Sequence, residues 1–341
     1  MKEERLPTIK EIAKQLKVSV STVSRALHDH PGIGLRTRMR VQQLAKDLNY
    51  EPNQSAIFFK QQKTFAIGVV LPNLKEEFFS EAISGIEDVA TLNKYNVLIG
   101  QSQDDPEKEK RIITTFKNYR VDGIIVSLGK YTRNYDHFTA LKKYNIPVVF
   151  FDRVPHLPDF NKVSSNMNSG TREAIEFLIG KGHRRIGIIN GPEEMESSRE
   201  RTRTYQQSLT KKRLKIDLSL VVSTDLTPES THAAMKDLLS QKPRPTAILA
   251  INDYVALDAM QYARKARLKI NKDICFVSYA NLSITSYLET PPLASVEQYP
   301  FQQGSKAATI LMDLLQKPSP AGQPETFQNI VINGQLVIHK K

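Results

Sequence analysis

The sequence predicts an α/β protein in which a small all-α domain at the N-terminus precedes a larger region of parallel sheets arranged in two lobes. Three observations lead to this fold class. Only helical periodicity occurs in roughly the first fifty residues. From Thr64 onward, short apolar runs alternate with amphipathic helical patterns, which is the βαβ signature of a parallel sheet. The length of 341 residues suggests two or three domains.

The segment from Thr8 to His28 contains two short helical patterns. The first has apolar residues at Ile9, Ile12, Ala13 and Leu16, the spacing of one helix face. Ser19 can cap the second helix, which turns an apolar face inward and a hydroxyl-rich face outward. This pattern is typical of a helix-turn-helix that enters the major groove of DNA, although a surface helical hairpin is the structural alternative. The outward side chains of the second helix are Ser21, Thr22, Ser24 and Arg25.

A third helical pattern extends to Asn49, and three helices of this size can close a small core. Pro52 then ends the pattern, and Asn53 can cap a further short turn. Phe58 and Phe59 stand in this polar connection, where they could either pack on the next domain or insert between base steps of a minor groove.

The apolar runs after Thr64 include FAIGVVLP, YNVLIG, VDGIIVSL, PVVFFD, RIGIINGP, TAILAIN and ICFVSYA. One sheet seldom accommodates so many βαβ units, so two lobes are expected, with the change between lobes near Asn161 to Val163. Ligands of open parallel sheets bind beyond the carboxyl ends of the strands. Polar residues at these ends are therefore candidate ligand groups, or else caps of the following helices. They are Asn73, Asp152, Arg153, Asn190, Asn252, Asp253 and Asn281.

The formal net charge is +12, and the first 63 residues carry 12 basic against 6 acidic side chains. A concentrated basic end suits contact with phosphates, so double-stranded DNA is the expected macromolecular partner. The single cysteine, Cys275, lies in an apolar run and is expected to be a buried thiol. We find no apolar leader segment and no stretch of membrane-spanning length, which predicts a cytoplasmic protein without membrane contact.

An ordered set of motifs resembles the LacI/GalR family of bacterial transcription regulators over essentially the whole chain. The motifs are TIKEIA, VSVSTVSRAL, NYEPN, IGVVLPN, VDGIIV, GHRRIG, RERTRTY and INDYVALDAM. The resemblance implies a homodimer, or a higher oligomer, that binds a pseudo-palindromic operator, with a hinge helix before a sensor similar to periplasmic binding proteins. It implies a small-molecule effector, derived from a carbohydrate, and a role most simply described as repression. No metal or cofactor is expected.

The resemblance also implies domain boundaries. Residues 1–60 would form the DNA-binding domain with its hinge, and 61–341 the effector-binding and dimerisation domain. As in the family, the segment LASVEQ to LMDLLQ would return to lobe 1 and the final strand NIVINGQLVIH to lobe 2. Lobe 1 would then comprise about 61–162 and 293–324, including the loop KPSPAGQP, and lobe 2 about 163–292 and 325–341.

Together, the residues and the resemblance predict two sets of site residues. The expected DNA contacts are Thr8, Ser19, Val20, Ser21, Thr22, Ser24, Arg25, Asn53, Ala56 and Phe59. The expected effector contacts are Asn73, Phe78, Phe79, Arg153, Asn166, Arg201, Asn252, Asp253 and Gln298.

Several positions depart from the family pattern. Asn166 stands where the family commonly has an aspartate, and where the family reads Gly-Phe-Asp-Asp this chain has Ser278, Tyr279, Ala280 and Asn281, so two carboxylates that frequently hold sugar hydroxyls are absent. With Arg153 and Arg201 in the pocket, this favours a sugar acid or phosphate over a neutral hexose, unless Asp152 or Asp253 neutralises these arginines. Lys17 occupies the turn between the two helices, where glycine or asparagine adopts a left-handed conformation more easily. Phe59 replaces the usual wedge leucine of the hinge.

An enzyme is the competing class, because parallel α/β sheets host many enzymes. The phosphate-binding, nucleophile-elbow and zinc-protease motifs are missing from the sequence. GKGHRRIG comes nearest to a dinucleotide motif, but Arg185 takes the place of its third glycine. We therefore expect no enzymatic activity. The remaining alternatives are a periplasmic-type sugar-binding protein and a regulator controlled by a protein partner.

Overall fold

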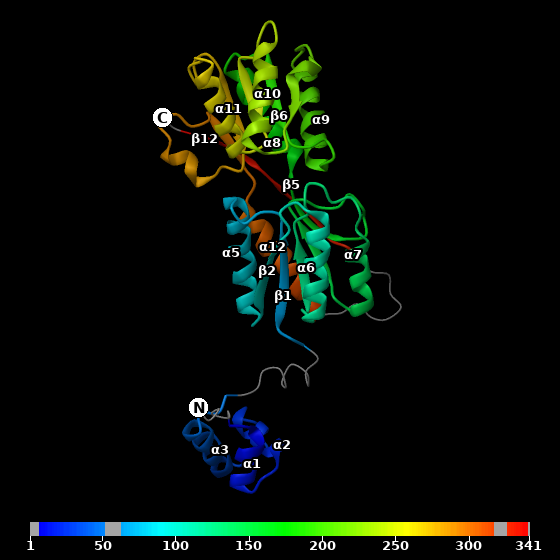
Figure 1. Ribbon diagram of the computed structural model, residues 1–341, viewed down its shortest axis with the longest axis vertical. Helices are drawn as coiled ribbons and strands as arrows, with labels where there is room; N and C mark the ends of the chain where they lie inside the picture. Colours follow the sequence, from blue (N-terminus) through cyan, green and yellow to red (C-terminus); the bar gives the residue numbers. More distant parts are fainter. Residues whose placement is uncertain (1–6, 52–62, 317–325, 340–341) are drawn as a thin grey trace. The chain divides into compact units, whose positions relative to one another are not determined.

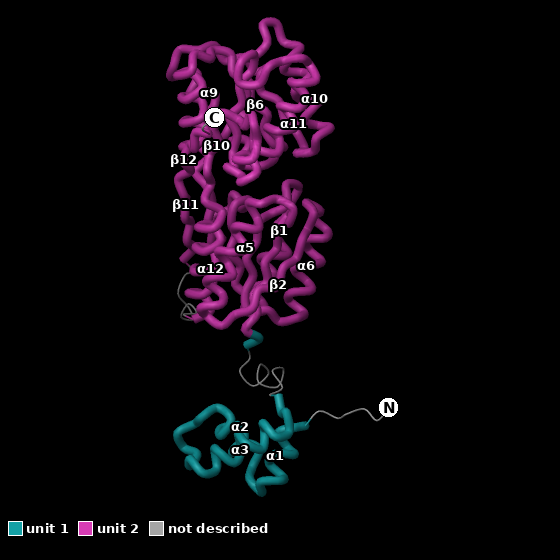
Figure 2. Tube along the Cα trace, turned by 90° about the vertical axis from the view of Figure 1, so that its left-hand side faces the viewer, with its two compact units in different colours: residues 1–64 teal, residues 65–341 magenta. Residues whose placement is uncertain are grey.

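The computed structural model describes residues 7–51, 63–316 and 326–339, which fall into two compact units, Met1–Thr64 and Phe65–Lys341 (Figure 2). The expected DNA contacts Asn53, Ala56 and Phe59, together with Phe58 and the loop KPSPAGQP, lie outside the described residues.

The first unit is a bundle of the three helices α1 (Ile9–Leu16), α2 (Val20–Leu27) and α3 (Leu35–Asp47). Thr8 and Glu11 form a reciprocal capping box at the start of α1, since each side chain accepts a hydrogen bond from the other's backbone N–H. The core is small, which makes such caps important for stability. Its buried members are Ile12, Ala13, Val23, Ala26, Val41 and Ala45.

Lys17 ends α1 in the left-handed region, with φ 54° and ψ 42°. Its N–H nevertheless donates to carbonyls of the last helical turn, so the tight turn to α2 is made without glycine or asparagine. Lys17 therefore adopts the left-handed conformation despite the steric cost that its Cβ atom causes there.

The second unit contains two six-stranded sheets, one in each lobe (Figure 1). The sheet of lobe 1 has the order β11-β5-β4-β3-β1-β2 and is parallel throughout. Its strands are β1 (Ala66–Leu71), β2 (Asn96–Gln101), β3 (Gly123–Val126), β4 (Val148–Phe151), β5 (Asn161–Asn166) and β11 (Asn329–Asn333).

The sheet of lobe 2 has the order β12-β10-β9-β8-β6-β7, in which only the pair of β10 and β12 is antiparallel. Its strands are β6 (Ile186–Asn190), β7 (Val221–Ser223), β8 (Ala247–Ala250), β9 (Cys275–Tyr279), β10 (Ala294–Glu297) and β12 (Gln335–Ile338). Cys275 is buried, as expected.

Helices cover both faces of each sheet, as their buried clusters show. Lobe 1 has α5 (Glu77–Leu92), α6 (Pro106–Asn118), α7 (Asp136–Thr139), α12 (Pro300–Gln316) and the 3₁₀ turn η1 (Ala140–Tyr144). Lobe 2 has α8 (Met167–Gly180), α9 (Glu196–Lys211), α10 (Pro228–Ser240), α11 (Asp253–Lys265) and the 3₁₀ turns η2 (Leu218–Leu220) and η3 (Ser283–Tyr287).

Helices α5 and α12 pack against each other across two glycines, although more than two hundred residues separate them in the sequence. A Cβ atom on Gly85 would lie 2.1 Å from the carbonyl oxygen of Phe301, and one on Gly304 would lie 2.0 Å from that of Ala82. Only glycine permits this approach of the two backbones, which binds the C-terminal part of the chain into lobe 1.

The sheet topology corrects the expected course of the chain between lobes. The strand from Asn161 to Asn166, expected to open lobe 2, is β5 of the lobe 1 sheet. The strand of LASVEQ, expected in lobe 1, is β10 of lobe 2, and only α12 returns. The final segment is two strands, of which β11 belongs to lobe 1 and β12 to lobe 2. The chain therefore crosses between the lobes after β5, after β10 and after β11, which a pattern of apolar residues does not reveal.

In the part of the chain that the structure describes, no helix has the length and apolar character needed to span a membrane, and no group of histidine, cysteine and acidic side chains could hold a metal ion.

Candidate functional site

The helix α2 presents the expected recognition surface of the first unit. Val23 and Ala26 are buried in the bundle, while Val20, Ser21 and Arg25 are exposed on the opposite side. Because the buried residues fix the rotation of the helix, its exposed face can enter a groove with Arg25 free to contact base edges. Of the four residues predicted to point outward, Ser21 and Arg25 are exposed, while Thr22 and Ser24 are half-buried.

Three of the expected DNA contacts also have structural roles. The Oγ atom of Ser19 accepts a hydrogen bond from the backbone N–H of Thr22 at 3.0 Å, and it lies 2.8 Å from the hydroxyl oxygen of that residue. Thr8 caps α1. Ser24 is half-buried, and its carbonyl oxygen lies 2.8 Å from Nδ1 of His28. Hydroxyl groups at helix starts can contact phosphates while they cap the helix.

A cavity lies between the lobes, at the carboxyl ends of the strands. Six of the nine expected effector contacts line it: Phe78, Phe79, Arg153, Arg201, Asn252 and Gln298. Asp152, one of the candidate ligand groups at strand ends, also lines the cavity. The rest of the lining was not predicted and consists of Glu76, Met167, Met195, Ser197, Leu226, Ile251, Tyr254, Ala280 and Leu282. Glu76 precedes α5 and Ala280 follows β9, so the rule that sites form at strand ends could have identified both.

The wall from lobe 1 combines aromatic rings with a charged cluster. The rings of Phe78 and Phe79 pack edge to face, with centroids 5.3 Å apart. The guanidinium of Arg153 lies 5.8 Å from the ring centroid of Phe79. Its Nη1 atom donates to Oδ1 of Asp104 at 2.9 Å, and its Nε atom lies 4.0 Å from Asp152. Carboxylates of lobe 1 therefore neutralise Arg153.

Burial shifts the titration of the two acidic side chains in this wall. Desolvation raises the pKa of Glu76, against the opposing attraction of Arg153. Desolvation likewise raises the pKa of Asp152, although Arg153 and a hydrogen bond from Ser127 favour its ionised form.

The wall from lobe 2 contains Arg201, whose side chain has only neutral direct partners. Its Nη1 atom donates to Oδ1 of Asn190 at 3.4 Å, and its guanidinium lies over the ring of Tyr279, 4.6 Å from the centroid. Its Nε atom is buried without a partner, and burial lowers the pKa of the side chain. None of the ion pairs among the described residues includes Arg201.

Three expected effector contacts are not brought to the cavity. The carboxylate of Asp253 is fully buried inside lobe 2, where it accepts hydrogen bonds from the hydroxyls of Ser278 and Ser295 and from the N–H of Leu282. Its carboxylate oxygens are satisfied inside lobe 2, so Asp253 does not line the cavity as expected of an effector contact.

The other two are Asn166, which caps α8, and Asn73, whose side chain stabilises the turn before α5. Asn166 accepts from the N–H groups of Asn168 and Ser169 at the start of α8, and it donates to Asn333 at 2.9 Å. Asn73 accepts from the N–H of Lys75 at 3.0 Å. Asn252 caps α11 in the same way, but it also lines the cavity.

Three residues in the cavity wall have unusual backbone conformations. Asp152 has a φ of 57°, Leu226 a φ of 72° and Ala280 a φ of 91°. Alanine rarely adopts this region, because its Cβ atom crowds the backbone. Such strain persists only where the surroundings enforce it, and it concentrates at ligand sites.

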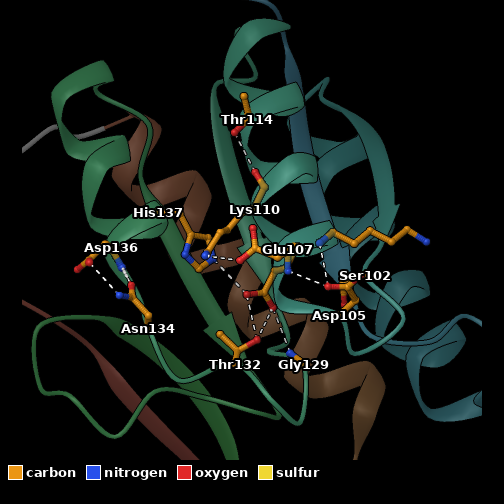
Figure 3. A network of polar contacts seen from close by, with 12 residues as sticks. Ser102, Asp105, Glu107, Lys110, Thr114, Gly129, Thr132, Asn134, Asp136 and His137 are labelled. Carbon is orange, nitrogen blue, oxygen red and sulfur yellow. Dashed lines mark hydrogen bonds and ion pairs between the residues drawn. The ribbon is translucent and has the colours of Figure 1, made fainter.

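A loop of lobe 1 connects the edge of the cavity to lobe 2. The buried carboxylate of Glu109 holds this loop through hydrogen bonds to the N–H of Gly129, the hydroxyl of Thr132 and Nε2 of His137 (Figure 3). From the anchored loop, Lys130 donates to the carbonyl oxygen of Asp225 in lobe 2 at 2.6 Å. Glu77 of lobe 1 also accepts from the N–H and hydroxyl of Ser283 in lobe 2. Direct hydrogen bonds thus join the two lobes at two places.

Comparison with known proteins places these features in a family. The profile described as "Bacterial regulatory proteins, lacI family" matches residues 8–53, and "Periplasmic binding proteins and sugar binding domain of LacI family" matches residues 64–340. Among curated relatives, Catabolite control protein A of Priestia megaterium is 30% identical over 91% of this chain and 93% of its own length. The HTH-type transcriptional repressor CytR of Escherichia coli K12 is 31% identical over 92% of each chain.

The fold is also that of a solved member. A Lac repressor dimer bound to operator and the anti-inducer ONPF aligns with a TM-score of 0.82 over 98% of both chains, at 24% identity. Helices placed to read DNA, two lobes around a cavity and the family match over most of the sequence agree. The chain belongs to the LacI family of bacterial regulatory proteins, and it is a DNA-binding transcriptional regulator rather than an enzyme.

Proposed function

We propose that the protein is a dimeric transcriptional repressor of the cytoplasm, whose two α2 helices bind the halves of a pseudo-palindromic operator and whose cavity binds an effector with an acidic group. The exposed face of α2 supports the first part, since Arg25 can form a bidentate contact with a guanine. The relatives named transcriptional repressors support the direction of regulation.

The proposal for an acidic effector rests on the guanidinium of Arg201, which is buried without an ionic partner among the described residues. A buried guanidinium without an ionic partner is costly, and an anionic ligand group would provide the missing charge and two parallel hydrogen bonds. Phe78 and Phe79 offer an apolar surface to the rest of the ligand. Arg153 contributes less attraction, because Asp104 and Asp152 already neutralise it. A sugar acid or sugar phosphate has the required combination of groups.

Binding between the lobes would favour one arrangement of lobe 1 and lobe 2, since the wall of the cavity comes from both. The links of Lys130 and Glu77 to lobe 2 would then be strengthened or broken. In this proposal, that rearrangement transmits the presence of the effector to the DNA-binding unit.

The test begins with selection of bound sequences from a random duplex library by the full-length protein. We expect the selected sequences to share a palindromic consensus. Arg25→Ala should bind this consensus with a binding free energy weaker by about 1 to 3 kcal/mol, and it should lose its preference at one base pair per half-site. Unaltered operator affinity in Arg25→Ala would contradict the assignment of α2.

The effector part is tested by isothermal titration calorimetry against glucose, gluconate and glucose 6-phosphate, extended to the other common hexoses, their acids and their phosphates. We expect binding of an acidic form and no heat from its neutral parent. A clear preference for a neutral sugar would contradict the acidic effector and leave the DNA-binding assignment intact.

A further inference from the structure

The second lobe has a strongly basic end on the side away from the cavity. Strands β6, β7, β8 and β9 are parallel, so the segments that precede them lie at one edge of the sheet. The cavity lies at the opposite edge, where these strands end. In Figure 1 the basic edge is the end of lobe 2 remote from lobe 1. The segments are 181–185, 211–217, 241–246 and 264–274.

These four segments contain 14 lysines and arginines but only two acidic residues, Asp217 and Asp273. Their net charge of +12 equals that of the whole chain, so the remaining sequence has 34 basic and 34 acidic side chains. Twelve of the basic side chains are exposed, and we name them the distal basic face: Lys181, Arg184, Lys211, Lys212, Arg213, Lys215, Lys242, Arg264, Lys265, Arg267, Lys269 and Lys272.

The charges of this face are not neutralised by acidic side chains of the described structure, although Arg184 donates to the carbonyl oxygens of Ile179 and His183 and Lys181 lies over the ring of Phe177. Arg185 and Arg244, the two half-buried members of the segments, contact Asp217 at 2.8 Å and the carbonyl oxygen of Asp273 at 2.9 Å. None of the ion pairs found among the described residues includes a member of the distal basic face. The positive potential is therefore available to an external partner.

Helix dipoles account for only part of this charge. Helices α8, α9, α10 and α11 end at this edge, and a cation near a helix C-terminus is stabilising by roughly 0.3 to 1 kcal/mol. Lobe 1 has the same arrangement, with helical elements ending before β2, β3 and β4. Its matching segments, 93–95, 117–122 and 140–147, contain five basic residues and one acidic residue. The excess in lobe 2 thus requires another explanation.

We propose that the distal basic face binds the phosphate backbone of duplex DNA without sequence preference, as a contact additional to that of α2. Duplex DNA carries one negative charge per roughly 1.7 Å of its axis, which suits a broad array of separate cations. Eight of the twelve exposed side chains are lysines, a residue depleted from protein interfaces. Among the large apolar side chains of these segments only Ile216 is exposed, so the apolar core of a protein interface is missing.

The first experiment compares two full-length variants of equal charge. The face variant has Lys211→Glu, Lys212→Glu, Lys265→Glu and Lys269→Glu. The control variant has Lys75→Glu, Lys94→Glu, Lys143→Glu and Lys306→Glu, all exposed lysines of lobe 1. Affinity for a 40-base-pair duplex of random sequence is measured against salt concentration, after circular dichroism has shown that both variants are folded.

The slope of log K against log salt is negative, and each lost phosphate contact reduces its magnitude by about 0.9. The magnitude for the face variant is therefore expected to be smaller than that of the wild type by about 3 to 4. The control variant is expected to keep the wild-type slope. Equal slopes in all three proteins, or an equal loss in both variants, would overturn the proposal.

Acetylation of the wild-type protein with an N-hydroxysuccinimide ester distinguishes DNA from an acidic protein. The random duplex is expected to protect Lys211, Lys212, Lys265 and Lys269 from modification and to leave Lys94 and Lys143 reactive. Protection by polyglutamate but not by the duplex would contradict DNA as the partner and indicate an acidic protein instead.

Discussion

Lobe 1 and lobe 2 each contribute one arginine to the cavity, the partly buried Arg153 and the buried Arg201, and the two guanidinium groups have opposite surroundings. Arg153 of lobe 1 lies against Asp104 and Asp152, so its charge is compensated within the protein. Arg201 of lobe 2 contacts Asn190 and Tyr279, which carry no charge. Two arginines that look equivalent in the sequence therefore differ in what they can offer a ligand. Whether a charged side chain has an ionic partner within the protein therefore indicates, better than its burial does, whether it can bind a charged ligand.

The largest expected effect is on ligand binding in Arg201→Met. Removing one partner of a buried charge pair costs roughly 2 to 5 kcal/mol, so affinity for an acidic effector should fall by about 30-fold or more. Stability without effector should be unchanged or higher, because an unpaired buried cation is lost. Calorimetry and thermal unfolding measure the two quantities. Full affinity in this variant would show that the acidic group binds elsewhere.

Arg153→Met should have the reverse pattern. Loss of this side chain leaves Asp152 without its cation and Asp104 with Lys130 alone, and breaking this partly buried ion pair from one side should cost about 1 to 3 kcal/mol of unfolding free energy. Urea unfolding of the full-length protein, with Arg201→Met as the matched control, tests the difference. Comparable stability of the two variants would remove the distinction between the arginines.

A smaller effect is expected from Tyr279→Phe, which keeps the ring beneath Arg201 and removes the hydroxyl that contacts Thr171. One lost hydrogen bond changes stability by about 1 kcal/mol. Because the ring contact survives, effector affinity should fall by less than tenfold, in contrast to Arg201→Met. A loss as large as that of Arg201→Met would mean that the hydroxyl, and not the guanidinium, recognises the ligand.

The smallest expected effect concerns pH. Because burial raises the pKa of Glu76 in the folded protein, the folded state holds its proton to a higher pH than the unfolded chain does. This contribution to stability is present below the unfolded pKa and is lost as the pH rises through the folded pKa. Glu76→Gln should therefore reduce the decline of unfolding free energy above about pH 4.5. Denaturation curves between pH 4 and 8 measure it, and an unchanged pH dependence would exclude Glu76 as its source.

The capping pattern and helical periodicity of the first unit were sufficient to predict its three helices and the exposed face of α2. These signals are local, because each depends on residues within one or two turns of the same helix. The alternation of apolar runs likewise predicted two lobes of parallel sheet. Family motifs spread over the whole chain then indicated the type of protein.

The tertiary structure alone decided which sheet each crossing strand joins and which polar side chains face the cavity. Strands β5, β10 and β11 have the same apolar pattern whichever lobe they enter, so their place depends on pairing with distant strands. Asp253 and Arg201 were both plausible ligand groups in the sequence, but Asp253 is satisfied by Ser278 and Ser295 inside lobe 2. The sequence by itself determined the elements and the family, since these depend on local pattern. Only packing between distant segments decided which charges are compensated, because compensation depends on distance in space.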